Sequence, residues 1–381
     1  MQRGQPNISN RAPTFIKSLT PLRGFAALIV AAGHFPGIAA AVAKSTQVLH
    51  HVYYSVDFFF VLSGFILLHV YGREFSSGVS KATAVRFLIA RIARIYPLHV
   101  ATLGALVALA LGHWLVSNYV LVTPTREPLT QYVDVPAVWT NLLLVQGWGI
   151  VNRESWNYPS WSISTEWAAY MLFPWLAALA VTNRLSPLML AAAAYGGIAA
   201  LIVTHGGLDA TLGPWALVRC VSEFCLGLAV YQIYVRAPDK TMFGHDAFAI
   251  AAVALVALMY HVRSPDILFP LAASALVLFC ALNRTAVLKL LSTRPCQFLG
   301  DISYSIYMVH MPFFTLFFVL EKVTGKPIAT LPAAVLTVVF LIYLSGTVVA
   351  AAVLYKTVEI PWRTRLRATL SRRMGAAEPT R

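Results

Sequence analysis

The sequence predicts an all-α integral membrane protein, a bundle of about ten transmembrane helices with both chain ends in the cytoplasm. Of the 381 residues, 58% are hydrophobic and only 12% are charged, which is about half the charge content typical of soluble proteins. The apolar residues gather in long runs, and the basic residues flank those runs unevenly. These three observations exclude a soluble multidomain protein of this length.

A membrane-spanning helix needs about 20 mostly apolar residues. Around the spans we expect a polar cytoplasmic segment (1–20), a membrane domain (21–363) and a basic cytoplasmic tail (364–381). No internal repeat is visible, so an inverted-repeat transporter gains no support. The candidate spans lie near residues 21–43, 53–71, 95–116, 161–182, 187–205, 214–235, 246–262, 267–283, 299–320 and 331–355. The long connection 117–160 carries Trp139, Trp148 and Trp156, and is long enough to cap the bundle.

The distribution of Lys and Arg sets the predicted orientation. The chain has 29 Lys and Arg against 15 Asp and Glu, a net charge of +14. With both ends in the cytoplasm, 22 basic residues lie on the cytoplasmic side, six lie on the other side, and Arg219 falls inside a span. Positive charge concentrates on cytoplasmic loops, so the asymmetry favours a multi-pass protein of the inner (plasma) membrane with membrane lipids around it.

Neither nucleic acid nor a metal ion is an expected partner. The basic residues flank apolar runs and do not form one solvated face, so nucleic acid is not a predicted partner. The four cysteines have no metal-ligand spacing, so neither a zinc site, nor any other metal, nor a disulfide framework is predicted.

The first predicted span contains two polar residues on one face. Arg23 and His34 are eleven residues apart, which is about three full helical turns and roughly 16 Å along the axis. Arg23 then lies at the cytoplasmic edge and His34 beyond the midplane. Ionisable groups at such depth are usually functional, although Arg23 can also be a snorkelling cation and His34 a hydrogen-bonded packing residue.

Two carboxylates are predicted at a depth similar to that of His34. Asp57 begins the second span, where it can accept a proton from a ring nitrogen of His34 and fix the tautomer. Glu166 shares a helix face with Ser162, four residues earlier. An imidazole and two carboxylates at one depth favour acid–base chemistry. The alternatives are a helix-contact hydrogen bond for Asp57 and a purely structural Glu166.

Arg91 and Arg94 are predicted on one face at the cytoplasmic end of the third span. Their spacing of three aligns the two guanidinium groups, and paired guanidinium forks suit phosphate oxygens. Lipid head groups are the alternative ligand. In contrast, Arg219 and Glu223 are four residues apart inside a span and are predicted to neutralise each other.

Other motifs carry less information. Ser303, Tyr307 and His310 recur on one helix face and either line a site or pack between helices. The stretch from His261 to Asp266 matches an HxxxxD pattern but lies in a short outer loop, and we interpret it as chance. The chain contains no GxSxG, Walker A or dinucleotide-binding fingerprint.

Several segments together resemble the acyltransferase-3 family of bacterial membrane acyltransferases, in a form without a fused SGNH domain. The resemblance covers nearly the whole chain, and its motifs occur in the order expected for the family. They are Arg23-x10-His34, Ser55-Val-Asp57 to Phe65, Arg91-x2-Arg94-x-Tyr96-Pro97, Trp161-Ser162-Ile-Ser164-Thr-Glu166, Glu223-Phe224-Cys-Leu-Gly227, Ile302 to His310, and Glu359-Ile-Pro361-Trp.

The resemblance implies an O-acetyltransferase that uses acyl-CoA, most often acetyl-CoA, as donor substrate, with no permanently bound cofactor. The acceptor would be a hydroxyl of an extracytoplasmic or lipid-linked glycan such as an O-antigen or exopolysaccharide. His34 would act as general base or carry the acyl group, Asp57 would orient it, and Glu166 would position the acceptor or shuttle a proton. The implied donor-binding residues are Arg23, Arg91 and Arg94, and the possible lining residues are Ser63, Ser162, Ser303, Tyr307 and His310.

Two other functions remain open at this stage. Intramembrane His, Asp, Glu and Arg side chains also suit a transporter or a proton-coupled flippase of an envelope precursor. A catalytically inactive scaffold for glycan assembly is the second alternative, and it predicts that His34→Ala leaves function intact.

Overall fold

Every regular element in the part of the chain that the structure describes is helical. The structure is a computed structural model, and it describes residues 15–35, 48, 50–119, 134–237, 242–324 and 327–374. The longer helices are α1 (Leu19–Gly33), α3 (Tyr54–Tyr71), α4 (Lys81–Tyr119), α6 (Trp161–Val181), α7 (Pro187–His205), α8 (Gly213–Arg236), α9 (Asp246–His261), α10 (Phe269–Leu282), α13 (Ser303–Thr324), α14 (Ala333–Leu354) and α15 (Ile360–Met374). Shorter helices are α5 (Val138–Leu142), α11 (Ala286–Leu291) and α12 (Arg294–Asp301).

The prediction of an all-α membrane protein is confirmed. By length and composition, five helical stretches of the described residues can cross a membrane, and a sixth can if α12 and α13, bent by 62°, form one span. The five stretches are Tyr54–Phe75, Lys81–Val116, Pro187–His205, Gly213–Arg236 and Ala333–Leu366. Each of the ten predicted segments overlaps a helix, and the segment 299–320 contains the bend between α12 and α13. The ten-span topology stays a prediction.

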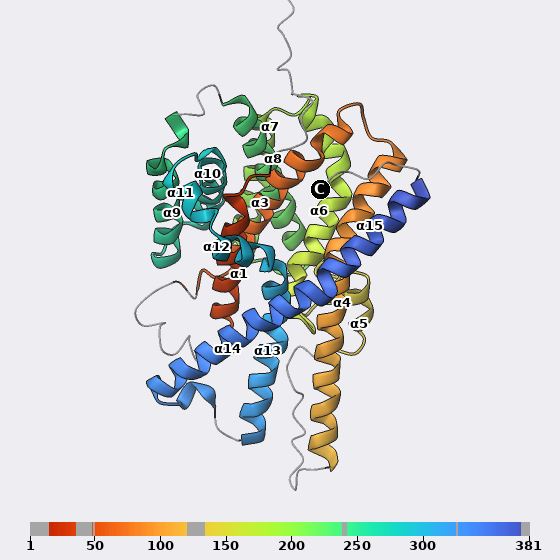
Figure 1. The fold of residues 1–381 in the computed structure, drawn as a ribbon, viewed down its shortest axis with the longest axis vertical. Coiled ribbons are helices and arrows are strands. Elements are labelled where there is room, and N and C mark those ends of the chain that lie inside the picture. Colours follow the sequence, from red (N-terminus) through yellow and green to blue (C-terminus); the bar gives the residue numbers. More distant parts are fainter. Residues whose placement is uncertain are drawn as a thin grey trace, which may run out of the picture.

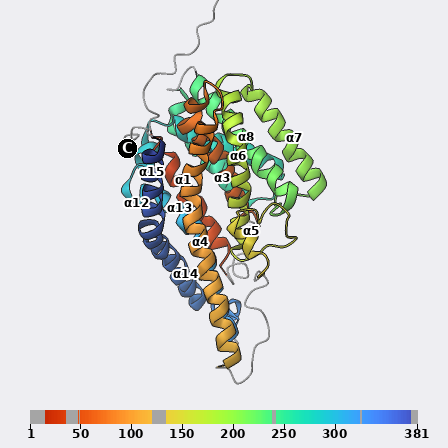
Figure 2. The same cartoon turned by 90° about the vertical axis from the view of Figure 1, so that its right-hand side faces the viewer.

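Two helices differ in extent from the predicted spans. Helix α1 ends at Gly33, and most of the remainder of the predicted segment 21–43 lies outside the described residues. Helix α4 begins at Lys81, well before the predicted start at 95, because residues 81–94 are mostly good helix formers. The two candidate phosphate-binding arginines therefore belong to the same helix as the span. Figures 1 and 2 show the C-terminal end of α4 extending beyond the other helices.

Close helix crossings position the elements that carry the site. Helix α3 packs against α8 where Gly64 meets Gly227: a Cβ on Gly227 would lie 2.0 Å from the Val61 carbonyl oxygen. Helix α1 crosses α12 in the same way, because a Cβ on Gly300 would lie 2.2 Å from the Thr20 carbonyl oxygen. Small residues at such crossings let helix backbones approach closely.

The described part of the predicted cap, residues 134–160, packs onto the bundle. The Asn157 amide donates a hydrogen bond to the Met308 carbonyl, at 3.0 Å. That carbonyl lacks its usual helical donor because Pro312, four residues later, has no N–H. The Trp148 indole N–H donates to the Ser164 carbonyl at 3.0 Å. These bonds fix the cap against α13 and the start of α6. Residues 120–133 of the predicted cap lie outside the described residues.

Candidate active site

A cationic pocket brings together most of the residues predicted for the site. Its lining includes eight of the eleven predicted site residues: Arg23, Ser63, Arg91, Arg94, Ser162, Glu166, Ser303 and Tyr307. These side chains come from α1, α3, α4, α6 and α13, so the pocket forms only when distant segments of the chain pack together. We call it the arginine pocket.

Arg91 is held in place within the arginine pocket and keeps spare hydrogen-bond donors. It is buried, and its Nη2 donates to the Tyr71 hydroxyl at 2.6 Å. Its guanidinium lies 4.8 Å from the centre of the Tyr71 ring. Among the described residues, Nε has no partner. Tyr304 donates to the Ile95 carbonyl at 2.5 Å and ties α13 to the same turn of α4. A fixed guanidinium with an unused donor fits an anionic ligand.

Glu166 lies among the arginines and lines the arginine pocket, not the pocket that contains His34. Ser63 Oγ donates to Glu166 Oε1 at 2.5 Å, and Arg23 interacts electrostatically with both Glu166 and Arg94. The equal depths inferred from helix rise therefore do not bring Glu166 to the imidazole. Its charge instead offsets part of the positive charge around it.

Sequence reasoning did not assign a site role to Glu359, which also belongs to this electrostatic group. Its Oε2 accepts a hydrogen bond from Ser305 Oγ at 3.1 Å, and its carboxylate interacts with Arg94 and Arg23. It lies in a π-helical turn between α14 and α15. The Glu359-Ile-Pro-Trp motif was the available signal.

A second pocket contains His34, and we call it the His34 pocket. The residues that line it are Val30, Gly33, His34, His50, Val52, Tyr53, Val56, Tyr158, Pro159, Trp161, Asp209, Thr211 and Tyr307. His34 Nδ1 lies 2.8 Å from the Val30 carbonyl oxygen. A carbonyl only accepts hydrogen bonds, so Nδ1 carries the proton and Nε2 presents its lone pair. The ring centre lies 5.1 Å from that of His310 and 5.9 Å from that of Tyr158.

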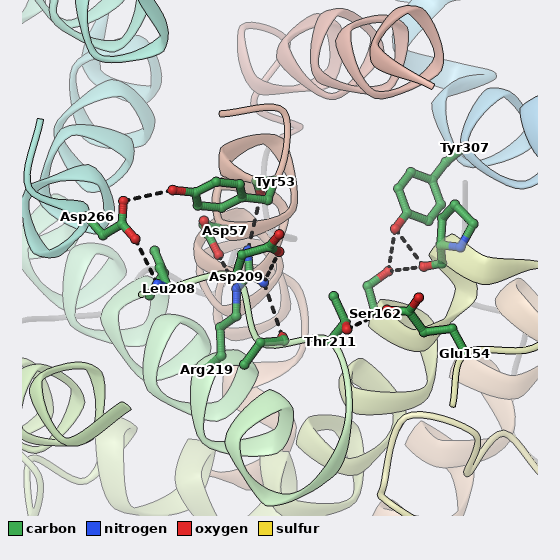
Figure 3. Close-up of polar contacts among 12 residues, drawn as sticks. Tyr53, Asp57, Glu154, Ser162, Leu208, Asp209, Thr211, Arg219, Asp266 and Tyr307 are labelled. Atoms are coloured by element: carbon green, nitrogen blue, oxygen red, sulfur yellow. Dashed lines mark hydrogen bonds and ion pairs between the residues drawn. The ribbon is translucent and has the colours of Figure 1, made fainter. Parts of the chain in front are cut away.

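Asp57 does not orient His34, contrary to the interpretation from depth. Its Oδ1 accepts a hydrogen bond from Arg219 Nε at 2.6 Å (Figure 3), and both side chains are fully buried. The Val30 carbonyl of α1 performs the role expected of Asp57. The His34 imidazole, at the end of α1, folds back onto the last turn of that helix.

The predicted pairing of Arg219 with Glu223 is also different in the structure. Arg219 binds Asp57 through Nε and Asp209 through Nη1, the latter at 3.1 Å. Its Nη2 donates to the Tyr53 carbonyl at 3.3 Å. Glu223 interacts electrostatically with both Asp57 and Arg219. Spacing of four residues places two side chains on one face, but here a neighbouring helix and a loop supply the closer carboxylates.

One wall separates the arginine pocket from the His34 pocket. Val56 and Tyr307 line both pockets. The Tyr307 hydroxyl lies 2.6 Å from Ser162 Oγ and donates to the Pro159 carbonyl at 2.8 Å; Figure 3 shows these contacts. Of the predicted stripe on α13, Tyr307 thus belongs to the boundary, and fully buried His310 lies beside His34.

Acidic groups at the edge of the His34 pocket were not predicted. Asp209, in the turn between α7 and α8, lines the pocket. Thr211 Oγ1 donates to Glu154 Oε1 of the cap at 2.7 Å. Burial raises the pKa of the Glu154 carboxyl, and the hydrogen bond from Thr211 acts in the opposite direction. The sequence contains only 15 acidic residues, and this low number was the only available signal for Asp209 and Glu154.

A helical membrane protein with a cationic pocket beside an imidazole pocket fits a group-transfer enzyme with an anionic donor. The chain matches the acyltransferase domain of the acyltransferase-3 family over residues 16–356, and it therefore belongs to that family.

Two curated relatives support the family assignment. The chain is similar to the acyltransferase MdmB of Streptomyces mycarofaciens, at 33% identity over 42% of this chain and 38% of the relative. It is also similar to protein 2 in the picA locus of Rhizobium radiobacter, at 34% identity over 33% of this chain and 60% of the relative. Each match thus spans less than two thirds of the relative. No solved structure matches the chain.

Proposed function

We propose that the protein transfers an acyl group, specifically acetyl, from cytoplasmic acyl-CoA to a hydroxyl of an extracytoplasmic or lipid-linked glycan. The observation that carries the proposal is the shared wall of Val56 and Tyr307 between a cationic pocket and an imidazole pocket. A donor held by its phosphates in one pocket then needs to extend only past Tyr307 to reach an acceptor in the other.

Arg91 and Arg94, with Arg23 beside them, would bind the phosphates of the donor. Three guanidinium groups line the arginine pocket with one carboxylate, Glu166, so the pocket favours an anion. The acyl end of the donor would run between α3 and α13 toward His34. In the predicted orientation, with both chain ends in the cytoplasm, the arginine pocket opens toward the cytoplasmic side of the inner membrane.

His34 would act as general base. Nε2 takes the proton of the acceptor hydroxyl, whose oxygen attacks the thioester carbonyl. The C–S bond breaks, and the thiolate of CoA leaves and receives the proton from the imidazolium. In the alternative relay, Nε2 attacks the thioester carbonyl first, the C–S bond breaks, and CoA leaves as the thiolate. The acceptor oxygen then attacks the acetyl group on the ring, its hydroxyl proton goes to the CoA thiolate, and the N–C bond to Nε2 breaks.

The test is transfer by the purified protein in liposomes, with radiolabelled acetyl-CoA and a panel of envelope glycans. We expect label in at least one glycan, and loss of that label when mild base cleaves the ester. A protein that neither binds acetyl-CoA nor labels any glycan would contradict the proposal. Protein that transports glycans without labelling them would favour the flippase alternative.

A further inference from the structure

We propose that the His34 pocket is the acceptor subsite, that it takes an uncharged sugar ring, and that Asp209 accepts hydrogen bonds from the ring hydroxyls. The inference rests on the proposed function and adds to it the place, the chemical class and a specificity-determining residue for the acceptor.

Asp209 has the exposure and the spare capacity that a binding residue needs. Its side chain is 51% exposed, whereas Arg219 beside it is fully buried. Its Oδ1 accepts one hydrogen bond from Arg219 Nη1, at 3.1 Å. A carboxylate has about four lone-pair sites, so this single bond leaves most of the acceptor capacity of Asp209 for a ligand.

Asp209 is also fixed in direction by buried structure. Arg219 holds it together with Asp57 on α3 and lies 5.2 Å from the centre of the Trp161 ring. Arg219 Nη1 also donates to the Ala210 carbonyl at 3.2 Å, next to Asp209 in the chain. The turn that carries Asp209 is therefore fastened to α3 and α8, and the carboxylate needs little ordering when a ligand binds.

The position of Asp209 relative to His34 fits an acceptor hydroxyl. Both residues line the same pocket, and the charge of Asp209 acts on the imidazole. A ring with adjacent hydroxyl groups can give one proton to His34 Nε2 while a neighbouring hydroxyl donates to Asp209. The same carboxylate then stabilises the imidazolium that forms when His34 accepts the proton.

The remaining lining selects the class of ligand. Tyr53, Tyr158 and Trp161 supply aromatic surface in the pocket, and aromatic faces pack against the apolar C–H face of a sugar ring. Asp209 lies in the pocket, and Glu154 contacts Thr211 at its edge. These carboxylates disfavour a phosphate or carboxylate ligand, so the pocket fits an uncharged polyhydroxylated ring.

The experiment uses the full chain in detergent, radiolabelled acetyl-CoA, and octyl glucoside, octyl galactoside and octyl mannoside as acceptors. The test variant is Asp209→Asn, which keeps Oδ1 as acceptor for Arg219 and removes the charge. The second variant is Asp209→Glu, which keeps the charge. The control is Asp134→Asn, which alters a carboxylate of the cap that is bound to Arg153.

We expect the wild type to acetylate at least one glycoside. Asp209→Asn should raise the KM for that glycoside about tenfold to a hundredfold, the loss for a hydrogen bond to a charged group. The KM for acetyl-CoA should stay unchanged, and Asp134→Asn should keep both constants. Asp209→Glu should fall between Asp209→Asn and the wild type, which separates loss of charge from misfolding.

Two results would overturn the inference while the proposed function stands. One is a wild-type KM for the glycoside in Asp209→Asn. The other is acetyl-CoA binding by a wild type that acetylates no glycoside. Failure of the wild type to bind acetyl-CoA would instead contradict the proposed function, and the subsite with it.

Discussion

Asp57 on α3 and Arg219 on α8 form a fully buried ion pair, with 2.6 Å between Oδ1 and Nε. The pair crosses the interface at which Gly64 and Gly227 bring the two helix backbones together. It also anchors Asp209 through the same guanidinium. Its main role in the structure is thus to join α3, α8 and the edge of the His34 pocket.

We expect Asp57→Ala to destabilise the protein, because it leaves a buried guanidinium without its closest partner. Breaking such a pair costs about 3–5 kcal/mol, which should lower the thermal unfolding midpoint in detergent and the membrane abundance. Transfer per folded molecule should fall less than in His34→Ala. The double variant Asp57→Ala with Arg219→Met should recover part of the stability. An unfolding midpoint equal to that of the wild type in Asp57→Ala would contradict this assignment.

Gly227→Ala should also destabilise the protein, through overlap with the α3 backbone. The added Cβ would lie 2.0 Å from the Val61 oxygen and 2.7 Å from the Phe65 nitrogen. Overpacking costs typically about 1–3 kcal/mol, and a rigid backbone gives little relief. The matched control is Gly196→Ala on α7, where nothing lies within 4 Å of the new Cβ. Equal thermal midpoints for the two variants would show that the crossing is not tight.

Arg91→Ala should weaken acetyl-CoA binding by about 1.5–3 kcal/mol, the contribution of a hydrogen bond to a charged group. Arg91→Lys should restore little, because an ammonium group lacks the planar fork. The same series at Arg94 should behave alike, and calorimetric titration of the purified variants provides the measurement. The control is Arg153→Ala in the cap, which should bind acetyl-CoA normally. Wild-type affinity in both arginine series would exclude a phosphate-binding role.

Reporter fusions test the predicted orientation. One fusion is placed after Ser77, between α3 and α4, and the other after Arg153 in the cap, between α5 and α6. The basic asymmetry predicts cytoplasmic activity for the first and periplasmic activity for the second. If both fusions are active on the same side, or each on the side opposite to the prediction, the arginine pocket lies away from cytoplasmic CoA.

Much of the fold followed from hydropathy, because each predicted apolar segment overlaps a helix of the described residues. The bend of 62° between α12 and α13 did not follow, since it depends on how α12 packs against α1 through Gly300. Likewise, helix rise gives the depth of a side chain but not the neighbour it faces. His34, Asp57 and Glu166 were therefore placed at similar depth, yet the structure distributes them among two pockets and an ion pair.

The contacts that sequence reasoning missed depend on backbone atoms or on the packing of helices that hydropathy does not specify. The Val30 carbonyl that fixes the His34 tautomer is a backbone atom and leaves no mark in the composition. Asp209 lies in a short turn, and only the packing of α7 and α8 brings it to the His34 pocket. In contrast, the Arg91 and Arg94 pair was predictable because its spacing alone determines the shared face.

We propose that His34 carries the chemistry, and the most direct test is acetyl transfer by His34→Ala. A general base contributes about 10²–10⁴-fold in rate, so the variant should lose nearly all transfer to glycan while it still inserts and still binds acetyl-CoA. His34→Gln should fail as well, because an amide does not accept a proton at neutral pH. The measurement is base-labile acetate released from the modified glycan, normalised to the amount of folded protein in the membrane. Near-wild-type acetate release by His34→Ala would contradict both the general-base and the relay mechanisms.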